Sequence, residues 1–146
     1  MLPIQNFRDL DAWNVAMETA AACYSLAAMV PQTERFGLGS QLRRAAVSIP
    51  SNIAEGHASG RDGILARHLG IALGSAAEVD TLLELSGRTG LLQKQDVSGV
   101  QTQLGRTRQL TYGLRRRVRG KLVRRGSTLS GALFVVCAWL STLFGP

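Results

Sequence analysis

Apolar residues recur at helical spacing over four long segments of the chain. Each stripe advances in alternating steps of three and four residues, which places its members on one face of an α-helix. No segment alternates apolar and polar residues like a half-buried strand. We therefore predict helices over about residues 9–29, 33–56, 59–87 and 96–125. The stripes consist of Leu10, Trp13, Met17, Ala20, Tyr24 and Ala27; Leu42, Ala45, Ala46, Ile49 and Ile53; Leu65, Leu69, Ala72, Ala76, Val79 and Leu83; and Val97, Val100, Leu104, Thr107, Thr111, Leu114 and Val118.

Short connections between these segments make successive helices antiparallel neighbours, so the expected fold is an all-α, up-down four-helix bundle. The chain has 146 residues, enough for one domain with a substantial core. We predict two parts, a bundle over residues 1–125 and an apolar C-terminal tail over residues 126–146. Thr33 is the expected N-cap of the second helix and Gly56 its expected end.

The second predicted helix contains a proline. Pro50 cannot donate a backbone hydrogen bond and leaves the carbonyl of Ala46 without its usual donor, so we expect a kink there. Polar residues surround this point, and Asn52 is suited to bond the freed backbone. A structural role for these residues is the favoured interpretation, and a ligand site at the kink is the alternative. The residues of this motif are Gln41, Arg44, Pro50, Asn52 and Glu55, of which Arg44 and Glu55 are expected to pair within or between subunits.

Positive charge is concentrated in the C-terminal third. Residues 94–146 contain ten Lys and Arg against a single acidic residue, whereas residues 1–93 contain seven against nine. Arginine donates two hydrogen bonds to a phosphate from its planar fork, so a nucleic-acid backbone is the favoured partner. A solvated polar face and a lipid-binding segment are the alternatives. The predicted nucleic-acid-binding residues are Arg106, Arg108, Arg115, Arg116, Arg117, Arg119 and Lys121.

Base-specific recognition is not expected from this helix. Tyr112 is the only aromatic residue between positions 94 and 125, which leaves little surface for stacking bases. We therefore predict binding that follows the phosphate backbone rather than the base sequence.

The last 21 residues carry no charge and include the apolar run 132–140. A bilayer core needs about 20 helical residues, so this 21-residue stretch is just long enough for a membrane anchor that follows the basic run, with residues 129–144 as the inserted part. An extra helix packed on an oligomer and an appended segment without a selected role are the alternatives.

Catalytic and metal-binding patterns are missing from the sequence. Cys23 and Cys137 form neither a disulfide framework nor a metal-ligand spacing, and Cys23 is expected to be a small buried residue. Neither His57 nor His68 stands three residues after a glutamate, as a di-iron bundle would require. The N-terminus lacks the apolar core of a signal peptide, so a cytoplasmic location is the default. We expect no enzymatic activity, no cofactor and no metal.

Several motifs of the chain resemble one bacterial family. They are FRDLDAW at 7–13, P-x-x-E at 31–34, LGSQLRRAAVSIPSNIAEG at 38–56, IALGSAAEVDTLL at 71–83 and GLL at 90–92. This set is similar to the four helix bundle protein family, also called the 23S rRNA intervening-sequence protein family. The resemblance implies an up-down four-helix bundle that assembles into a homopentameric ring, with no established enzymatic activity. It also implies a distant kinship to the accessory variability determinant of diversity-generating retroelements, a basic barrel that binds nucleic acid and a reverse transcriptase.

Three functional hypotheses follow from the sequence. The leading one is a non-enzymatic oligomeric scaffold that binds a nucleic-acid backbone, RNA or DNA, through its fourth helix, together with a partner protein such as a polymerase. The second is an oligomer tethered to a membrane by its tail, and the third is a purely structural oligomer.

Overall fold

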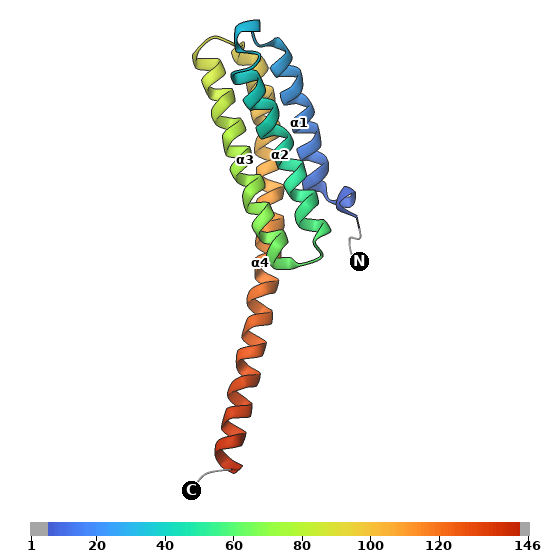
Figure 1. Ribbon diagram of the computed structural model, residues 1–146, viewed down its shortest axis with the longest axis vertical. Coiled ribbons are helices and arrows are strands. Elements are labelled where there is room, and N and C mark those ends of the chain that lie inside the picture. The colour runs from blue at the N-terminus through green and yellow to red at the C-terminus, as the bar shows by residue number, and fades with distance from the viewer. Residues whose placement is uncertain (1–5, 144–146) are drawn as a thin grey trace.

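The computed structural model describes the backbone of residues 6–143 and the side chains of residues 6–124. Within that range the chain contains no strand. Its helices are α1 (Asp11–Met29), α2 (Leu38–Ala58), α3 (Asp62–Arg88) and α4 (Lys94–Leu143), with short 3-10 turns η1 (Phe7–Asp9) and η2 (Gln32–Glu34). Successive helices run antiparallel, and each packs on its two neighbours, α4 closing the ring against α1 (Figure 1). This confirms the predicted up-down four-helix bundle.

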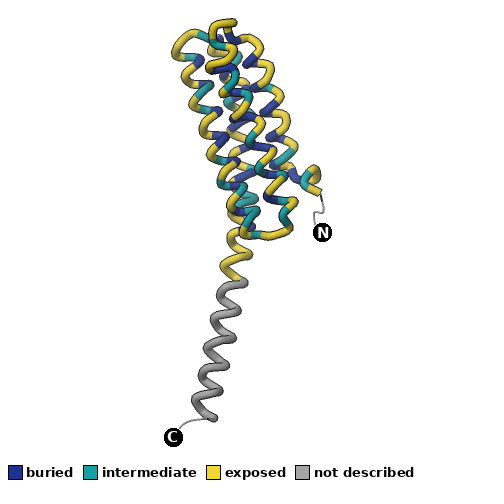
Figure 2. Tube along the Cα trace, viewed as in Figure 1, coloured by how far each residue is buried: buried dark blue, intermediate teal, exposed yellow. Residues whose placement is uncertain are grey.

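The core is aliphatic and lies along the axis between the four helices (Figure 2). The predicted stripes of α2, α3 and α4 are buried, apart from Leu65 and Leu114, which are half-buried at its edge. Because most of the core side chains are Ala, Val, Leu and Ile, the helices can approach one another closely.

The stripe predicted for α1 is partly wrong. Met17 and Tyr24 are 44% and 48% exposed, and the buried face passes instead through Ala16, Thr19 and Cys23. Apolar residues surround α1 almost completely, so the three-and-four spacing does not single out one face. Small residues occupy the inner face and let α1 approach its neighbours, while the larger side chains remain outside.

The ends of α2 also differ from the prediction. The helix begins at Leu38, because Thr33 lies in η2 and the carboxylate of Glu34 accepts the hydrogen bond of the Leu38 amide at 3.2 Å. It ends at Ala58, two residues beyond Gly56. Gly56 is buried against α3, where a Cβ atom would lie 2.8 Å from the Cβ of His68. Close helix packing therefore requires this glycine, which does not end the helix.

A glycine turn follows the end of α3. Gly90 has a φ of 71°, the left-handed conformation that glycine adopts without strain, and the next residue, Leu91, returns its amide to the carbonyl of Ser86 at 3.0 Å. This turn reverses the chain into α4, which begins at Lys94 rather than at the predicted Asp96.

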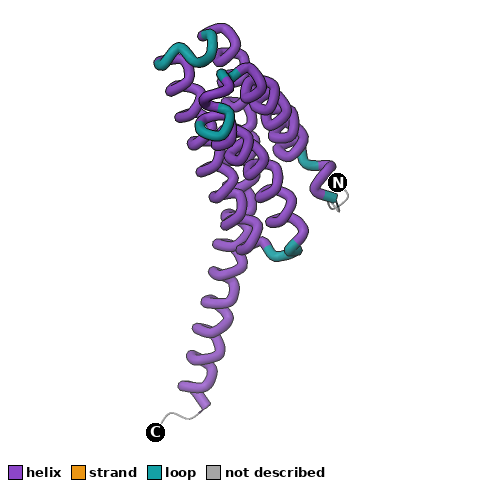
Figure 3. The backbone as a smooth tube through the Cα atoms, turned by 45° about the horizontal axis from the view of Figure 1, so that its top comes forward, coloured by secondary structure: helices purple, strands orange, loops and turns teal. Residues whose placement is uncertain are grey.

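At 50 residues, α4 is by far the longest helix, about 75 Å at 1.5 Å per residue. It continues past the α2–α3 loop at the end of the bundle (Figures 1 and 3). Its backbone passes residue 125 without a break. The side chains from residue 125 onward lie outside the described part, so the division into bundle and tail stays a prediction.

No helix within the described residues is long and apolar enough to cross a membrane. The membrane segment predicted at 129–144 falls outside the residues whose side chains are described, so it also stays a prediction.

Candidate nucleic-acid interface

Packing of α4 on α1 and α3 decides which of its side chains face outward. Val100, Leu104 and Val118 are buried against the bundle. Between them, the hydroxyl of Thr107 lies 2.8 Å from that of Thr19 on α1, with both side chains fully buried. A hydrogen bond between two buried groups contributes about 0.5–1.5 kcal/mol, so this pair favours one rotation of α4 about its axis. The basic residues are positioned by that rotation.

Two of the predicted arginines are tied to α3. Arg108 donates from Nη1 to the carboxylate of Asp80 at 3.1 Å. Arg115 is half-buried and donates from Nε to the carbonyl oxygen of Ala66 at 3.2 Å. Its guanidinium lies over Gly70, where a Cβ atom would come within 3.2 Å of Nη2. Both arginines therefore help to hold α4 on α3.

The other five predicted cations face the solvent. Each is exposed, and within the described side chains none makes a hydrogen bond or an ion pair. They are Arg106, Arg116, Arg117, Arg119 and Lys121. Their charges are not neutralised by their own helix, since Asp96 is the only acidic residue in α4.

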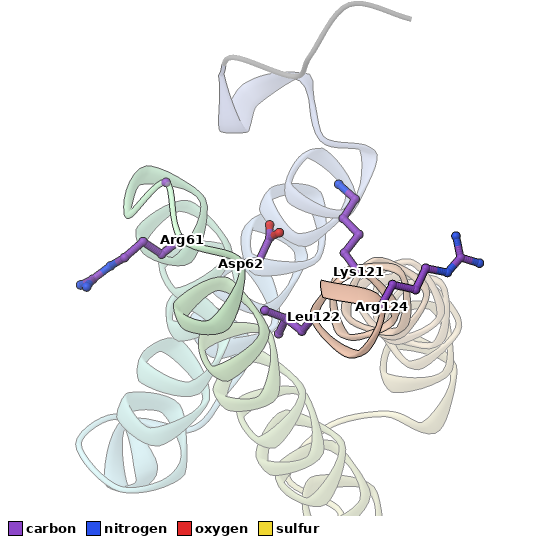
Figure 4. Close-up of a pocket in the computed structure, with 6 residues that line it drawn as sticks. Arg61, Asp62, Lys121, Leu122 and Arg124 are labelled. Carbon is purple, nitrogen blue, oxygen red and sulfur yellow. The ribbon is translucent and has the colours of Figure 1, made fainter. Parts of the chain in front are cut away.

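An open depression of about 690 Å³ lies where the α2–α3 loop meets α4. Arg61 from the loop and Lys121 and Arg124 from α4 line it, together with Asp62 (Figure 4). The guanidinium groups of Arg61 and Arg124 point outward on opposite sides (Figure 4). Because these side chains diverge, they do not enclose a single phosphate. They extend across the end of the bundle the basic surface, by which we mean the surface formed by the seven predicted cations of α4.

The polar motif of α2 forms a chain of hydrogen bonds with α3. The Asn52 amide donates to the carbonyl and the hydroxyl oxygen of Ser48 at 2.8 and 3.1 Å, and the Ser48 hydroxyl lies 2.8 Å from that of Ser75. His68 Nδ1 lies 3.1 Å from Asn52 Oδ1. That amide oxygen can only accept, so His68 carries its proton on Nδ1. Asn52 thus links the two helices, but it bonds the carbonyl of Ser48 and not that of Ala46.

The remaining residues of the motif occupy separate positions. Pro50 is buried within α2, and the helix continues through it. Arg44 donates to the side-chain oxygen of its neighbour Gln41, and both are exposed. Glu55 lies 3.6 Å from His68 Nδ1. Arg44 stands three helical turns away from Glu55, so the two do not pair within this chain, and pairing between subunits stays a prediction.

His68, Ser75 and Asp80 are contacts that the sequence reasoning missed. One signal was present: Asn52 and His68 both lie eight residues from Gly60. Residues at equal distances from the turn of a helical hairpin face each other when both lie on the inner sides. The Asp80–Arg108 pair joins α3 to α4, but its two residues lie at unequal distances from Gly90, so spacing gave no such signal for it.

The described part contains no cluster of metal-ligating side chains, and its one described thiol is not activated. No group of three His, Cys, Asp or Glu side chains there could hold a metal ion. Cys23 is a free, fully buried thiol, as expected, and burial raises its pKa to about 11. The thiol therefore stays protonated at neutral pH and is a poor nucleophile.

The comparison with family models decides the family. Residues 8–113 match the family described as 23S rRNA-intervening sequence protein. The chain belongs to this family. Its fold is similar to the crystal structure of a protein of unknown function from the S23 ribosomal protein family of Bacteroides thetaiotaomicron VPI-5482. The two share 23% sequence identity with a TM-score of 0.66, over 70% of this chain and 96% of the other. No match is found among curated proteins.

The family match ends before most of the basic surface. Arg106 and Arg108 lie within residues 8–113, whereas the predicted cations from Arg115 to Lys121 lie beyond them. Any role of these cations must therefore be argued from the chemistry of this chain.

Proposed function

We propose that this 23S rRNA-intervening sequence protein is a non-enzymatic, oligomeric scaffold that binds the phosphate backbone of nucleic acid through α4. The observation that carries the proposal is the set of five exposed, unpaired cations Arg106, Arg116, Arg117, Arg119 and Lys121 on one rigid helix. Four of them lie within six residues, which is about 8 Å along the helix. Such a density of guanidinium groups matches a polyanion better than a single acidic side chain.

The structure separates two roles among the predicted arginines. Arg108 and Arg115 are bonded to α3, so their first contribution is to orient the helix. The free cations then supply contacts that depend on charge and not on base identity, and their binding should weaken steeply with salt. The solvated-face alternative explains exposure, but it does not require so many like charges side by side.

Self-association is supported by exposed apolar side chains on α1 and α2. Met17, Tyr24 and Val47 are each more than 40% exposed. Val47 lies one turn from Arg43, whose guanidinium reaches the carbonyl of Ala27 on α1, so it borders the α1–α2 groove. Exposed apolar side chains on neighbouring helices favour contact with another protein surface. We propose that a second copy of the chain covers this face and builds the homo-oligomer, a pentamer by family resemblance.

Replacing Met17 with lysine tests this interface. Burying a lysine at a subunit contact leaves its charge without a partner, so the oligomer should dissociate while the monomer stays helical. Sedimentation velocity measures the mass of both proteins, and Glu18→Lys on the α4 side of α1 is the control. An M17K protein that sediments like the wild type would remove this face from the assembly.

Binding itself is tested by titrating the full-length protein into labelled structured RNA, single-stranded DNA and duplex DNA at low salt. We expect submicromolar affinity for at least one of the three, because several phosphate contacts form at once. Fluorescence anisotropy measures it. The proposed function would be refuted if the protein bound none of the three nucleic acids. A polymerase partner and a cytoplasmic location stay predictions.

A further inference from the structure

Tyr112 stands in α4 between Arg108 and Arg115, and its side chain is 60% exposed. Aromatic side chains of a helical bundle are usually buried, since removing an aromatic ring from water is strongly favourable. Here the ring stands over a shallow groove between α3 and α4 of about 410 Å³, lined by Leu73, Arg108, Gln109 and Tyr112. The only aromatic residue between positions 94 and 125 is therefore available to a ligand.

Cations flank this ring along the helix. Arg108 precedes Tyr112 by four residues and Arg116 follows it by four, so each lies one turn away on the same face, at about 6 Å along the axis. Arg108 is held in place by its ion pair with Asp80. Arg116 is exposed and has no partner among the described side chains. A group that stacks on the ring would thus meet positive charge on both sides.

The groove also offers a polar and an apolar wall. Gln109 lies three residues before Tyr112, and its amide can both donate to and accept from the edge of a ring. Leu73 of α3 is half-buried and supplies an apolar surface. A flat aromatic face, an apolar floor, an amide and two flanking cations match a nucleobase attached to a phosphate chain.

We infer that Tyr112 stacks on an unpaired base, so that the preferred ligand of the proposed interface is single-stranded nucleic acid. This inference rests on the proposed function and names its substrate class. In a duplex the base faces are covered by their neighbours, so duplex DNA can reach only the cations. Single strands gain the stacking contact in addition, whatever their sequence, because every base has a flat face.

Substitution of Tyr112 separates the two contributions. Tyr112→Ala in the full chain should weaken binding to an unstructured single strand about tenfold, the scale of one base–aromatic stack, and leave binding to a duplex of equal length unchanged. Tyr112→Phe keeps the ring and should restore wild-type affinity. Phe36→Ala removes an exposed aromatic ring outside α4 and outside the proposed contact between subunits, and it is the control. Circular dichroism melting verifies that each variant is folded.

A second measurement identifies the contact directly. Ultraviolet cross-linking of a 5-bromouracil-containing single strand should join Tyr112, as mapped by mass spectrometry. Equal single-strand affinity of the wild type and Y112A, with cross-links elsewhere, overturns the stacking while leaving backbone binding intact. Absence of binding to both single strand and duplex refutes the proposed function and the stacking together.

Discussion

Replacing Gly56 with alanine is expected to destabilise the bundle. The new Cβ would lie 2.8 Å from the Cβ of His68 and 3.2 Å from the Cα of Leu65, atoms close to the α3 backbone that no side-chain rotation can move. Helices α2 and α3 must then separate, which also strains the Asn52–His68 hydrogen bond. Overpacking costs about 1–3 kcal/mol, more than the roughly 0.5–1 kcal/mol that alanine adds to a helix. Thermal unfolding followed by circular dichroism should show a lower Tm.

Gly99→Ala is the matched control for this substitution. Gly99 is exposed within α4, and nothing lies within 4 Å of where a Cβ would stand. The same chemical change should therefore raise the Tm, because only the helical preference of alanine acts. If both variants shift the Tm in the same direction, the close contact at Gly56 is not a feature of the folded protein.

Neutralising three of the free cations should have the largest effect on binding. A protein carrying Arg116→Gln, Arg117→Gln and Arg119→Gln loses three positive charges without losing a bond to the bundle, because these side chains have no partner among the described residues. Each phosphate contact contributes to affinity through counterion release. At low salt we expect the affinity for nucleic acid to fall at least about tenfold, with helicity unchanged.

The loss of affinity should depend on where the three arginines lie and not only on the net charge of the protein. The control protein carries Arg8→Gln, Arg35→Gln and Arg88→Gln, an equal change in charge at exposed positions outside α4. It should bind nearly as tightly as the wild type, apart from a small long-range effect of charge. Equal losses in the two triple variants would indicate attraction by the total charge of the molecule and would argue against a defined surface on α4.

Most of the fold could be predicted from the sequence, because periodic burial is a local property. The stripes of α2, α3 and α4 each have one clearly apolar face, and the structure buries it. For α1 this logic fails: alanines surround the helix, so spacing alone does not decide between the face with Met17 and Tyr24 and the face with Ala16 and Cys23. The partner helices make that choice, and they select the small residues.

The sequence predicts which residues make up the candidate site, but not which of them are bonded to the bundle. The cluster of arginines is visible in the sequence, yet only three-dimensional packing shows that Arg115 is bonded to Ala66 of α3 while Arg116 is free. The prediction that Gly56 ends α2 was wrong for the same reason. In sequence, Gly56 has the pattern of a helix end, and only the distance to His68 explains why a glycine stands there.

Family membership accounts for the fold of the chain, whereas most of the predicted nucleic-acid-binding residues lie beyond residue 113. The 23S rRNA-intervening sequence family accounts for residues 8–113, and the structural neighbour of unknown function shares that fold. The densest part of the basic surface follows at Arg115 to Lys121. If α4 binds nucleic acid, this property arises largely from residues outside the family match.

Salt dependence tests the central claim most directly. The logarithm of the binding constant for one labelled single strand is measured against the logarithm of salt concentration, for the wild type and for the triple variant of Arg116, Arg117 and Arg119. Backbone binding through these residues predicts two straight descending lines, with the slope of the variant smaller by about 2, since each lost phosphate contact removes about 0.7. Two parallel lines, or a wild-type constant that does not change with salt, would contradict the account.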